Sequence, residues 1–335
     1  MTGILIVNLG TPDAPSRGAV YRYLKQFLLD PRVIDINPVS RNLLVRGIIA
    51  PFRSKNSSDS YKLLWTEKGS PLKFYGESLV KGVQEALGSE YMVELAMRYQ
   101  SPSIASALER MKKAQVHKIK VLPLFPQYAS ASTGSVQEEV MRLLSRELVV
   151  PSVEFISEFA TYGPMIDVFV KHARQFDIDS YDHILFSYHG IPQRHLRNAD
   201  PSGNHCLQKA DCCQTLTSVN QYCYSAQCYA TTRALVERLG LKKEQYTVSF
   251  QSRLGRDPWT QPYTIRTLEM LAKEKGAKRL LVFCPAFTAD CLETIVEIGI
   301  EYKEEFVHWG GEHVDLVPSL NDDPDWIKGV ADMVR

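Results

Sequence analysis

The sequence predicts an α/β protein made of two doubly wound, Rossmann-like domains, each with a parallel sheet, and an inter-domain cleft. Three observations predict this fold class. Apolar runs bounded by turn residues alternate with helix-like stretches, the 335 residues correspond to about two average domains, and both halves contain a similar strand-to-turn segment. A composition of 44% hydrophobic and 23% charged residues is typical of globular proteins.

Each expected strand is a short apolar run between turn residues. The expected strands cover residues 4–9, 92–96, 118–122, 183–188, 246–250 and 279–283. The helix-like stretches cover residues 19–29, 78–87, 103–113, 136–147, 230–239 and 264–274. Strands that alternate with helices form βαβ units with right-handed crossovers, so both sheets should be parallel.

The domain boundaries follow from these two series of strands. Residues 1–157 form the expected N-terminal α/β domain and residues 158–320 the C-terminal α/β domain, which carries a cysteine-rich insertion. Residues 321–335 form a C-terminal helix that could pack back on the first domain. The segments 122–126 and 283–287 resemble each other. Because ligands of open α/β sheets bind beyond the carboxyl ends of strands, both turns should face one cleft.

The charges of the chain nearly cancel, with 39 Lys and Arg against 38 Asp and Glu and a net charge of +1. Such a chain has no overall field that would hold nucleic acid or an anionic membrane. No apolar run approaches the roughly 18 residues of a membrane span. The uncharged residues 1–8 lack a basic start and a cleavage site, so they are interpreted as a strand and not as a signal peptide. We expect a cytoplasmic protein without a nucleic-acid partner, and the oligomeric state is not predicted.

Residues 40–60 differ in character from the rest of the chain. An apolar helix-like stretch, residues 43–52, stands beside the basic residues Arg41, Arg46, Arg53 and Lys55. Such a segment suits a lip over the cleft or a peripheral contact with a membrane surface. An ordinary surface helix and loop explains it equally well.

The motif Ser187-Tyr188-His189-Gly190 stands where an expected strand ends. A side chain at this point projects toward the cleft, and imidazole titrates near neutral pH, so His189 could accept or pass a proton. Gly190 permits the close approach of the backbone to a ligand. The alternative is a structural histidine that only makes hydrogen bonds at the end of the strand.

Four carboxylates follow one another at helical spacing and should form one acidic stripe. The stripe consists of Asp290, Glu293, Glu297 and Glu301. Like charges at this spacing destabilise a helix by about 0.2–0.5 kcal/mol per pair, so the arrangement favours a function such as attracting a divalent cation. The alternative is that Asp290 and Glu293 cap the helix while the other two carboxylates are solvated.

Three further side chains are candidates to line the cleft. Tyr128 precedes a small, hydroxyl-rich turn, Arg98 follows an expected strand, and Trp259 lies in a loop that begins with a proline. Taken alone, each of them is explained by a role in the core or on the surface.

Together these residues resemble the ferrochelatases, which insert ferrous iron into a porphyrin to make haem. The resemblance covers nearly the whole chain and keeps the motifs in the family's order. The motifs are Asn8-Leu9-Gly10-Thr11-Pro12, Gly69-Ser70-Pro71-Leu72, Met97-Arg98-Tyr99, Leu124-Phe125-Pro126-Gln127-Tyr128, Ser187-Tyr188-His189-Gly190 and Ala286-Phe287-Thr288-Ala289-Asp290-Cys291-Leu292-Glu293-Thr294.

The resemblance implies roles for the residues that match these motifs. His189 matches the active-site histidine, and Glu293 matches its partner carboxylate across the pocket. Asp290 and Glu297 match an acidic path that leads from this carboxylate. The resemblance thus implies that all four side chains, of His189, Glu293, Asp290 and Glu297, contact the iron substrate. The implied porphyrin-binding residues are Leu9, Arg98, Tyr128, Trp259 and Phe287.

The implied reaction converts protoporphyrin IX and Fe²⁺ to protohaem and two protons, the terminal step of haem biosynthesis. Iron enters only if the ring is puckered and both inner N–H protons leave. A tight apolar pocket would impose this strain with binding energy from the rest of the disc. We expect His189 to accept pyrrole protons and Glu293 to take part in proton removal or metal delivery. The sequence leaves coproporphyrin open as a substrate, although apolar walls favour protoporphyrin.

Five of the seven cysteines lie close together, in the pattern Cx5CCx9Cx4C. Thiolates at this density suit Zn²⁺ or an iron–sulfur cluster. Some ferrochelatases hold a [2Fe–2S] cluster through internal cysteines, so the resemblance implies this cofactor with four of the five as ligands; zinc or free thiols are the alternatives. The five residues are Cys206, Cys212, Cys213, Cys223 and Cys228.

Two other functions compete with this prediction. A cobalt chelatase of the same superfamily would act on a more carboxylated tetrapyrrole and should have a more cationic pocket. A redox or metal-sensing binding protein would depend on the cysteines and would not need His189 or Glu293.

Overall fold

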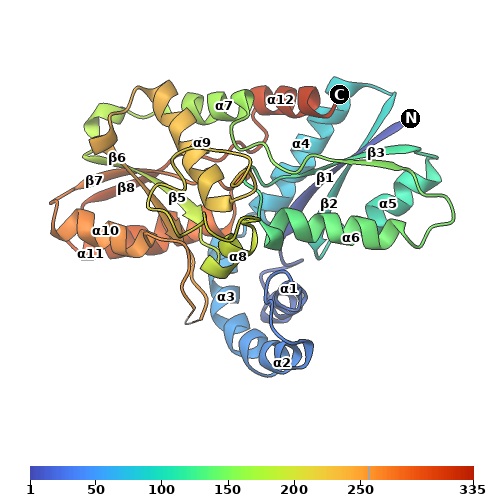
Figure 1. Cartoon of the computed structure of the whole chain (residues 1–335), viewed down its shortest axis with the longest axis horizontal. Coiled ribbons are helices and arrows are strands. Elements are labelled where there is room, and N and C mark those ends of the chain that lie inside the picture. Colours follow the sequence, from blue (N-terminus) through green and yellow to red (C-terminus); the bar gives the residue numbers. More distant parts are fainter. Residues whose placement is uncertain (256) are drawn as a thin grey trace. The chain divides into compact units, whose positions relative to one another are not determined.

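Parallel strands form the centre of each half of the chain (Figure 1). The structure is a computed structural model that describes residues 1–255 and 257–335. Its residues form two compact units, which are described separately. The first unit comprises Met1–Phe125, Ala129–Glu158 and Asn321–Arg335, and the second comprises Pro126–Tyr128 and Phe159–Leu320.

Among the described residues, the first unit contains a four-stranded parallel sheet in the order β2-β1-β3-β4. The strands are β1 (Thr2–Gly10), β2 (Tyr91–Tyr99), β3 (Lys118–Pro123) and β4 (Ser152–Phe155). The helices of this unit are α1 (Arg17–Leu28), α2 (Pro38–Leu44), η1 (Val45–Ile49), α3 (Ala50–Leu64), α4 (Pro71–Leu87), α5 (Ile104–Lys113), η2 (Ser130–Gly134), α6 (Ser135–Leu144) and α12 (Pro324–Val334).

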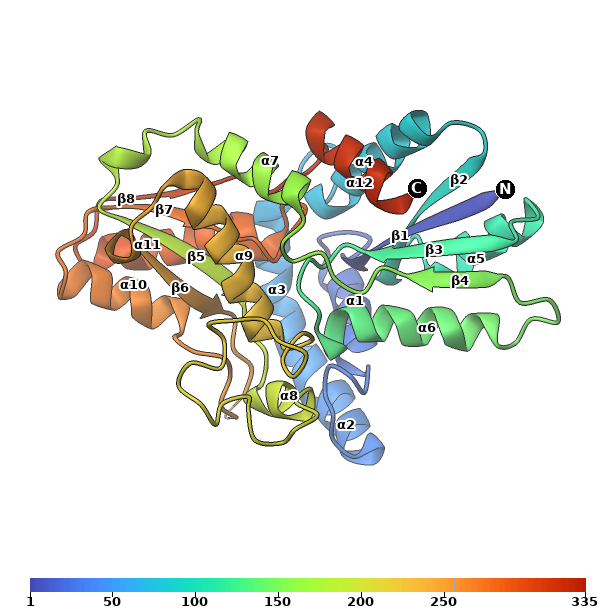
Figure 2. The same ribbon diagram turned by 45° about the horizontal axis from the view of Figure 1, so that its top comes forward.

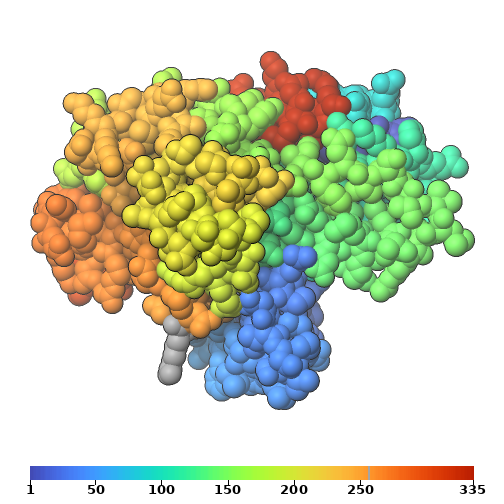
Figure 3. All heavy atoms as spheres, in the orientation of Figure 1, coloured from blue at the N-terminus to red at the C-terminus, as the bar shows by residue number. Residues whose placement is uncertain are grey.

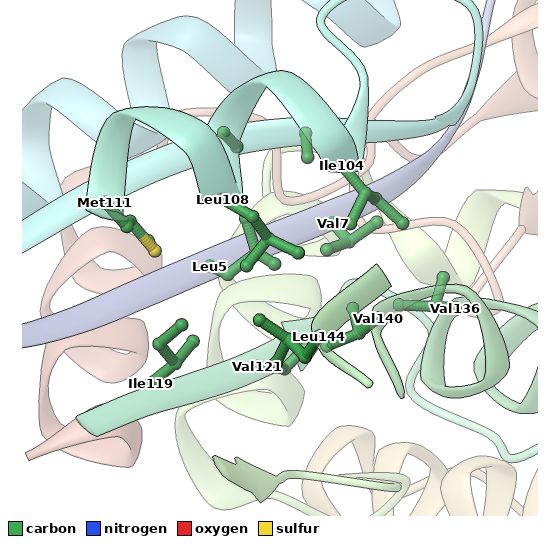
Figure 4. Packing of buried hydrophobic residues seen from close by; sticks show 12 residues of the cluster. Leu5, Val7, Ile104, Leu108, Met111, Ile119, Val121, Val136, Val140 and Leu144 are labelled. Carbon is green, nitrogen blue, oxygen red and sulfur yellow. The ribbon is translucent and has the colours of Figure 1, made fainter. Parts of the chain in front are cut away.

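The core of the first unit lies between the sheet and α5 with α6 (Figure 4). Leu5 and Val7 of β1 point to this face because alternate residues of a strand share a face, and Ile4 and Ile6 therefore point to the opposite face. All four side chains are fully buried. Helix α4 covers the opposite face, where Gly76 lets it approach Leu95 of β2.

The C-terminal helix α12 packs on α4 of the same unit. Figure 3 shows this helix in red against the cyan segment that includes α4. Gly82 makes the contact possible, because a Cβ atom there would lie 2.7 Å from the Ile327 side chain. Trp326 of α12 is completely buried, so the helix is part of the unit's core.

The second unit repeats the same strand order, β6-β5-β7-β8, again with parallel neighbours among the described residues. Its strands are β5 (His183–His189), β6 (Tyr246–Gln251), β7 (Arg279–Phe283) and β8 (His313–Leu316). Its helices are α7 (Gly163–Ala173), η3 (Ile178–Ser180), α8 (Gln193–Asn198), α9 (Tyr224–Leu239), η4 (Lys243–Gln245), α10 (Thr264–Lys273), η5 (Leu292–Tyr302) and α11 (Lys303–His308).

Helices cover both faces of this second sheet (Figure 2). On one face, Leu185 of β5 and Leu280 of β7 pack against α10, η5 and α11. On the other face, the buried Tyr188 donates to or accepts from Thr232 of α9 at 2.8 Å. The two units together confirm the predicted α/β class with parallel sheets.

Three of the four residues of the predicted acidic stripe lie on a π-helix. Glu293 and Glu297 lie on η5, which is a π-helix with i→i+5 hydrogen bonds and not an α-helix. Asp290 lies before this helix, and Cys291 is its N-cap. Residues four apart are still close to one full turn apart in a π-helix, so Glu293, Glu297 and Glu301 share one side of η5.

Candidate active site

The predicted catalytic residues of the second unit gather at the carboxyl ends of its central strands. His189 is the last residue of β5, and Gln251, the last residue of β6, is its partner in register. Phe287 follows β7 by a short turn, in which its N–H donates to Cys284 O at 3.1 Å. Ligands of open α/β sheets bind at this edge, beside the point where the strand order reverses.

His189 is held in one tautomer by its own loop. Its Nδ1 lies 2.6 Å from the carbonyl oxygen of Gly190, and because a carbonyl only accepts, Nδ1 carries the proton and Nε2 is left with a lone pair. The main-chain carbonyl of His189 accepts a hydrogen bond from Tyr224 Oη at 2.7 Å. A fixed backbone and a fixed tautomer therefore orient Nε2 as a proton acceptor.

Two aromatic side chains flank the imidazole. The rings of Trp259 and Phe287 each have centroids 6.4 Å from the centroid of His189. Trp259 is fixed through its backbone, which pairs with Pro192 and accepts from Gln193 Nε2 at 3.2 Å. Both rings are half-buried, so they present apolar surface beside the proton acceptor.

Glu293 stands in the first turn of η5, where a reciprocal cap begins the helix. Thr294 Oγ1 accepts from the backbone N–H of Cys291 at 3.0 Å, and the Cys291 sulfur accepts from the backbone of Thr294. The cap is therefore formed by this pair and not by Asp290 with Glu293. The Cys291 thiol interacts with the Glu293 carboxylate, and burial together with that charge raises the pKa of this thiol.

Asp290 is buried and accepts two hydrogen bonds on Oδ1. Thr294 Oγ1 donates at 3.0 Å and the backbone N–H of Ser319 at 3.3 Å. The residue thus joins the start of η5 to the segment that follows β8.

Glu297 has each of its oxygens held by two donors. Oε1 accepts from Ser252 N at 3.1 Å and from Tyr302 Oη at 2.9 Å. Oε2 accepts from Ser252 Oγ at 2.7 Å and from Gln251 Nε2 at 3.1 Å. A carboxylate offers about four acceptor positions, so this one is fully engaged by the protein. Burial and this carboxylate raise the pKa of Tyr302, which keeps its hydroxyl a donor.

Tyr128 also belongs to the second unit. Its backbone N–H donates to Gln227 Oε1 at 2.6 Å, and its ring lies edge-on to Tyr222 with centroids 5.4 Å apart. The structure thus fixes Tyr128 through α9 and the loop before it.

Leu9 and Arg98 belong to the first unit. Leu9 is half-buried, and its N–H donates to Asn8 Oδ1 at 2.8 Å. Arg98 donates from Nη2 to Asp30 Oδ2 at 2.7 Å and from Nε to Ser135 Oγ at 2.7 Å. The guanidinium is therefore engaged by its own unit.

Four of the clustered cysteines form a chain of thiol contacts in a loop at the surface of the second unit, yellow in Figure 3. The sulfurs of Cys212 and Cys213 are 3.8 Å apart. Cys213 interacts with Cys223, and Cys223 with Cys206. Cys228 is completely buried in α9, and its thiol interacts with Tyr224.

These contacts bear on whether the cysteines fit a metal centre. Within residues 1–255 and 257–335, no group of three or more His, Cys, Asp or Glu side chains stands in metal-ligating geometry. Two thiolates on one tetrahedral metal, each about 2.3 Å from it, would be about 3.8 Å apart, which is the Cys212–Cys213 separation. Burial raises the pKa of Cys206 and Cys212, so both thiols are protonated at neutral pH.

Sequence reasoning missed Gln251, Ser252, Tyr224 and Tyr302. A lone polar residue at the end of an apolar run has no periodic signal, and only the position of Gln251 directly after an expected strand could have indicated it.

The comparisons with known proteins identify the family of the chain. The ferrochelatase family profile matches residues 1–335. The chain is 45% identical to the ferrochelatase of Legionella pneumophila (strain Lens) over 336 residues, 99% of this chain and 98% of that protein. It is 44% identical to the ferrochelatase of Coxiella burnetii (strain Dugway 5J108-111) over 333 residues, 99% of this chain and 93% of that protein.

Solved structures support the fold alone. SirB from Bacillus subtilis with Fe³⁺ superposes with a TM-score of 0.55 at 12% identity, covering 100% of this chain and 94% of that chain. Among residues 1–255 and 257–335, no helix combines the length and apolar character needed to cross a membrane. With a full-length family match and relatives this similar, the chain belongs to the ferrochelatase family of metal chelatases.

Proposed function

We propose that the chain inserts Fe²⁺ into protoporphyrin IX and releases two protons, which completes protohaem. The observation that carries the proposal is His189, whose Nδ1–H is fixed on Gly190 O so that Nε2 accepts protons between two aromatic rings. Family membership supports the same reaction.

The porphyrin is an apolar disc, and aromatic surface suits it. Trp259 and Phe287 lie near the imidazole at equal centroid distances, and they would contact the macrocycle by stacking or edge contacts. Tyr128, Leu9 and Arg98 are proposed as further porphyrin contacts on the strength of the family motifs.

The reaction exchanges two pyrrole N–H protons for one Fe²⁺, so charge balances with two released protons. His189 Nε2 accepts each pyrrole proton in turn, and the Glu293 carboxylate carries protons onward or receives the metal. Glu297 is already engaged by four donors, so we assign it a fixed negative charge that favours the incoming cation and the imidazolium. The iron is the substrate in this scheme.

The test is anaerobic incubation of the protein with Fe²⁺ and protoporphyrin IX, followed by the appearance of the haem spectrum. His189→Ala should lower the rate of insertion by about 10²–10⁴-fold, the usual contribution of a positioned general base. Glu293→Gln should also slow the reaction. His308→Ala changes an exposed histidine of α11 in the same unit and should leave the rate unchanged. Near-normal turnover of His189→Ala would reject the assignment, and so would the absence of turnover in the unsubstituted protein.

We also propose that Cys206, Cys212, Cys213 and Cys223 hold a [2Fe–2S] cluster, with Cys228 as the spare cysteine. The chain of thiol contacts among the four supports this choice of ligands. Such a cluster supplies one-electron redox chemistry and a cross-link between loop segments.

The experiment compares the visible absorbance, iron content and acid-labile sulfide of the protein with those of Cys213→Ser and Cys284→Ser. Cys284 is a buried cysteine outside the cluster. Loss of colour, iron and sulfide in Cys213→Ser with retention in Cys284→Ser supports the proposal. A colourless protein with stoichiometric zinc would overturn it.

A peripheral membrane contact through residues 40–60 is the remaining part of the proposal. Leu43 and Phe52 are 70% and 75% exposed, and the exposed Arg46 and Arg53 lie on the same helical segment. An apolar surface with basic neighbours suits an anionic bilayer. Cosedimentation with anionic vesicles that Phe52→Ser weakens would support the contact, and equal recovery of both proteins in the supernatant would exclude it.

A further inference from the structure

Gln251 lies where the two sides of the candidate site meet. It is the last residue of β6, pairs in register with His189 of β5, and is 1% exposed. Its backbone holds the histidine side of the site, and its side chain holds the carboxylate side.

The backbone carbonyl of Gln251 accepts the N–H of Gly190 at 2.7 Å. Gly190 in turn provides the carbonyl that fixes the tautomer of His189. The contact is so close that a Cβ atom on Gly190 would lie 3.0 Å from the carbonyl oxygens of Gln251 and Ser252. The position of the imidazole therefore depends on the end of β6.

The side chain of Gln251 holds η5 at two points. Nε2 donates to the backbone carbonyl of Glu293 at 2.9 Å and to Glu297 Oε2 at 3.1 Å. One amide group thus ties the first turn of the π-helix, which carries Glu293, to its middle and to the sheet.

The orientation of this amide is determined by its other neighbours. Oε1 accepts from Ser187 Oγ at 2.7 Å and from the thiol of Cys284 at 3.8 Å. Burial and the nearby carboxylates raise the pKa of Cys284, so its thiol remains a donor. Donors on one side and acceptors on the other leave a single orientation for the amide.

A buried chain of hydroxyls continues behind Gln251. Ser187 Oγ is 2.9 Å from Thr264 Oγ1, which is 2.8 Å from Ser249 Oγ. All three hydroxyl-bearing residues are buried, and they come from β5, α10 and β6. Packing and hydrogen bonds therefore fix the rotamer of Gln251 before any substrate binds.

We propose that Gln251 is a positioning residue for metal insertion, which sets the geometry between the His189 imidazole and the Glu293 turn through one buried amide and its own carbonyl. The inference rests on the proposed function and adds a residue to it. It predicts a defect in turnover and not in porphyrin affinity, because Gln251 is 1% exposed and its hydrogen bonds reach Gly190 and η5.

The experiment measures kcat and the porphyrin KM for Gln251→Met and Gln251→Glu. Methionine keeps the volume and removes the hydrogen bonds. We expect Gln251→Met to lower kcat about 10- to 100-fold with KM within about threefold, since misplacement by about 1 Å costs on the order of 10²-fold. Gln175→Leu, which changes an exposed glutamine of the same unit, should match the unsubstituted protein.

The pH profile of kcat in Gln251→Glu tests the positioning role, because substitution of a purely structural residue would leave the shape of this profile unchanged. A carboxyl here lies beside Glu297 and Glu293 on η5, His189 on β5, Cys284 after β7 and Tyr302 on η5. Its neutral form has one O–H in place of the two amide N–H groups, so the ratio of its kcat to that of the unsubstituted protein should be highest at acidic pH. As that carboxyl ionises beside Glu297, kcat should fall, which adds a basic limb to the pH profile.

The outcomes separate this inference from the proposed function. If the unsubstituted protein makes no haem, the proposed function fails. If it makes haem and Gln251→Met has a normal kcat, or loses activity only through a raised KM, the inference on Gln251 is overturned. Should Gln251→Met not fold, the pH profile of Gln251→Glu decides: a profile parallel to that of the unsubstituted protein overturns the inference, and an added basic limb supports it.

Discussion

Replacing Gly190 by alanine tests how closely the site depends on the contact between β5 and β6. The new Cβ would lie 3.0 Å from two backbone carbonyl oxygens and 3.3 Å from Thr260 Oγ1. Backbone oxygens cannot rotate away, so either the strand ends separate or the peptide after His189 shifts. Both movements weaken the 2.7 Å bond from Gly190 N to Gln251 O and displace the carbonyl that holds the His189 Nδ1 proton.

The size of the effect follows from the cost of overpacking. Inserting a methyl group into a packed site costs about 1–3 kcal/mol. If displacement of the imidazole raises the activation free energy of metal insertion by this amount, the rate of insertion falls by about 5- to 150-fold. The assay is the anaerobic rate of haem formation, with thermal unfolding measured in parallel. Gly163→Ala is the control, because a Cβ atom there meets no heavy atom within 4 Å. A Gly190→Ala rate within twofold of that control would refute the reasoning.

Three other predictions concern stability. Asp30→Ala should lower the free energy of unfolding by about 3–5 kcal/mol, because Asp30 is the buried carboxylate partner of the Arg98 cation. Gly311→Ala should cost about 1–3 kcal/mol and lower Tm, because its Cβ would lie 2.1 Å from the completely buried ring of Phe306. Burial lowers the pKa of His183 below 6.5, so the unfolded chain binds more protons there and stability should fall as the pH drops below about 6.5. His183→Gln should show a smaller fall.

Each of these predictions has a matched comparison. Glu138→Ala changes a half-exposed carboxylate that pairs with Arg32. It should lower the free energy of unfolding much less than Asp30→Ala does. Gly47→Ala adds a Cβ with no neighbour within 4 Å and should leave Tm nearly unchanged beside Gly311→Ala. The prediction for His183 is tested by the urea midpoints of unfolding at pH 7.5 and 5.5. If the unsubstituted protein and His183→Gln lose equal stability between these pH values, His183 is not the cause of the loss.

Six strands, including the edge strands β2 and β6, were predictable because their sequences are mostly apolar runs between turn residues. The edge strands β4 and β8 were not predicted, since each has four residues and is mostly exposed or half-buried. Such short, partly polar segments resemble loops when only the sequence is read. Helix α7 was not predicted, whereas α12 lies within the C-terminal helix expected over residues 321–335.

The sequence indicated residues of the candidate site but not the hydrogen bonds that connect them. Motif resemblance indicated His189 and Glu293, but neither the π-helix that carries Glu293 nor the hydrogen bonds to it from Ser252 and Gln251 were predicted. Clustering indicated a thiol site, whereas which thiols contact one another depends on the fold of the loop and of α9.

The central claim is that His189 Nε2 removes the pyrrole protons, and the most direct measurement compares porphyrin binding with turnover in His189→Ala. Binding is measured by fluorescence titration with protoporphyrin IX, and turnover by haem formation under anaerobic conditions. We predict a dissociation constant within about threefold of that of the unsubstituted protein and turnover at least about 100-fold lower. Unchanged turnover, or a loss of turnover fully explained by weaker binding, would contradict the account.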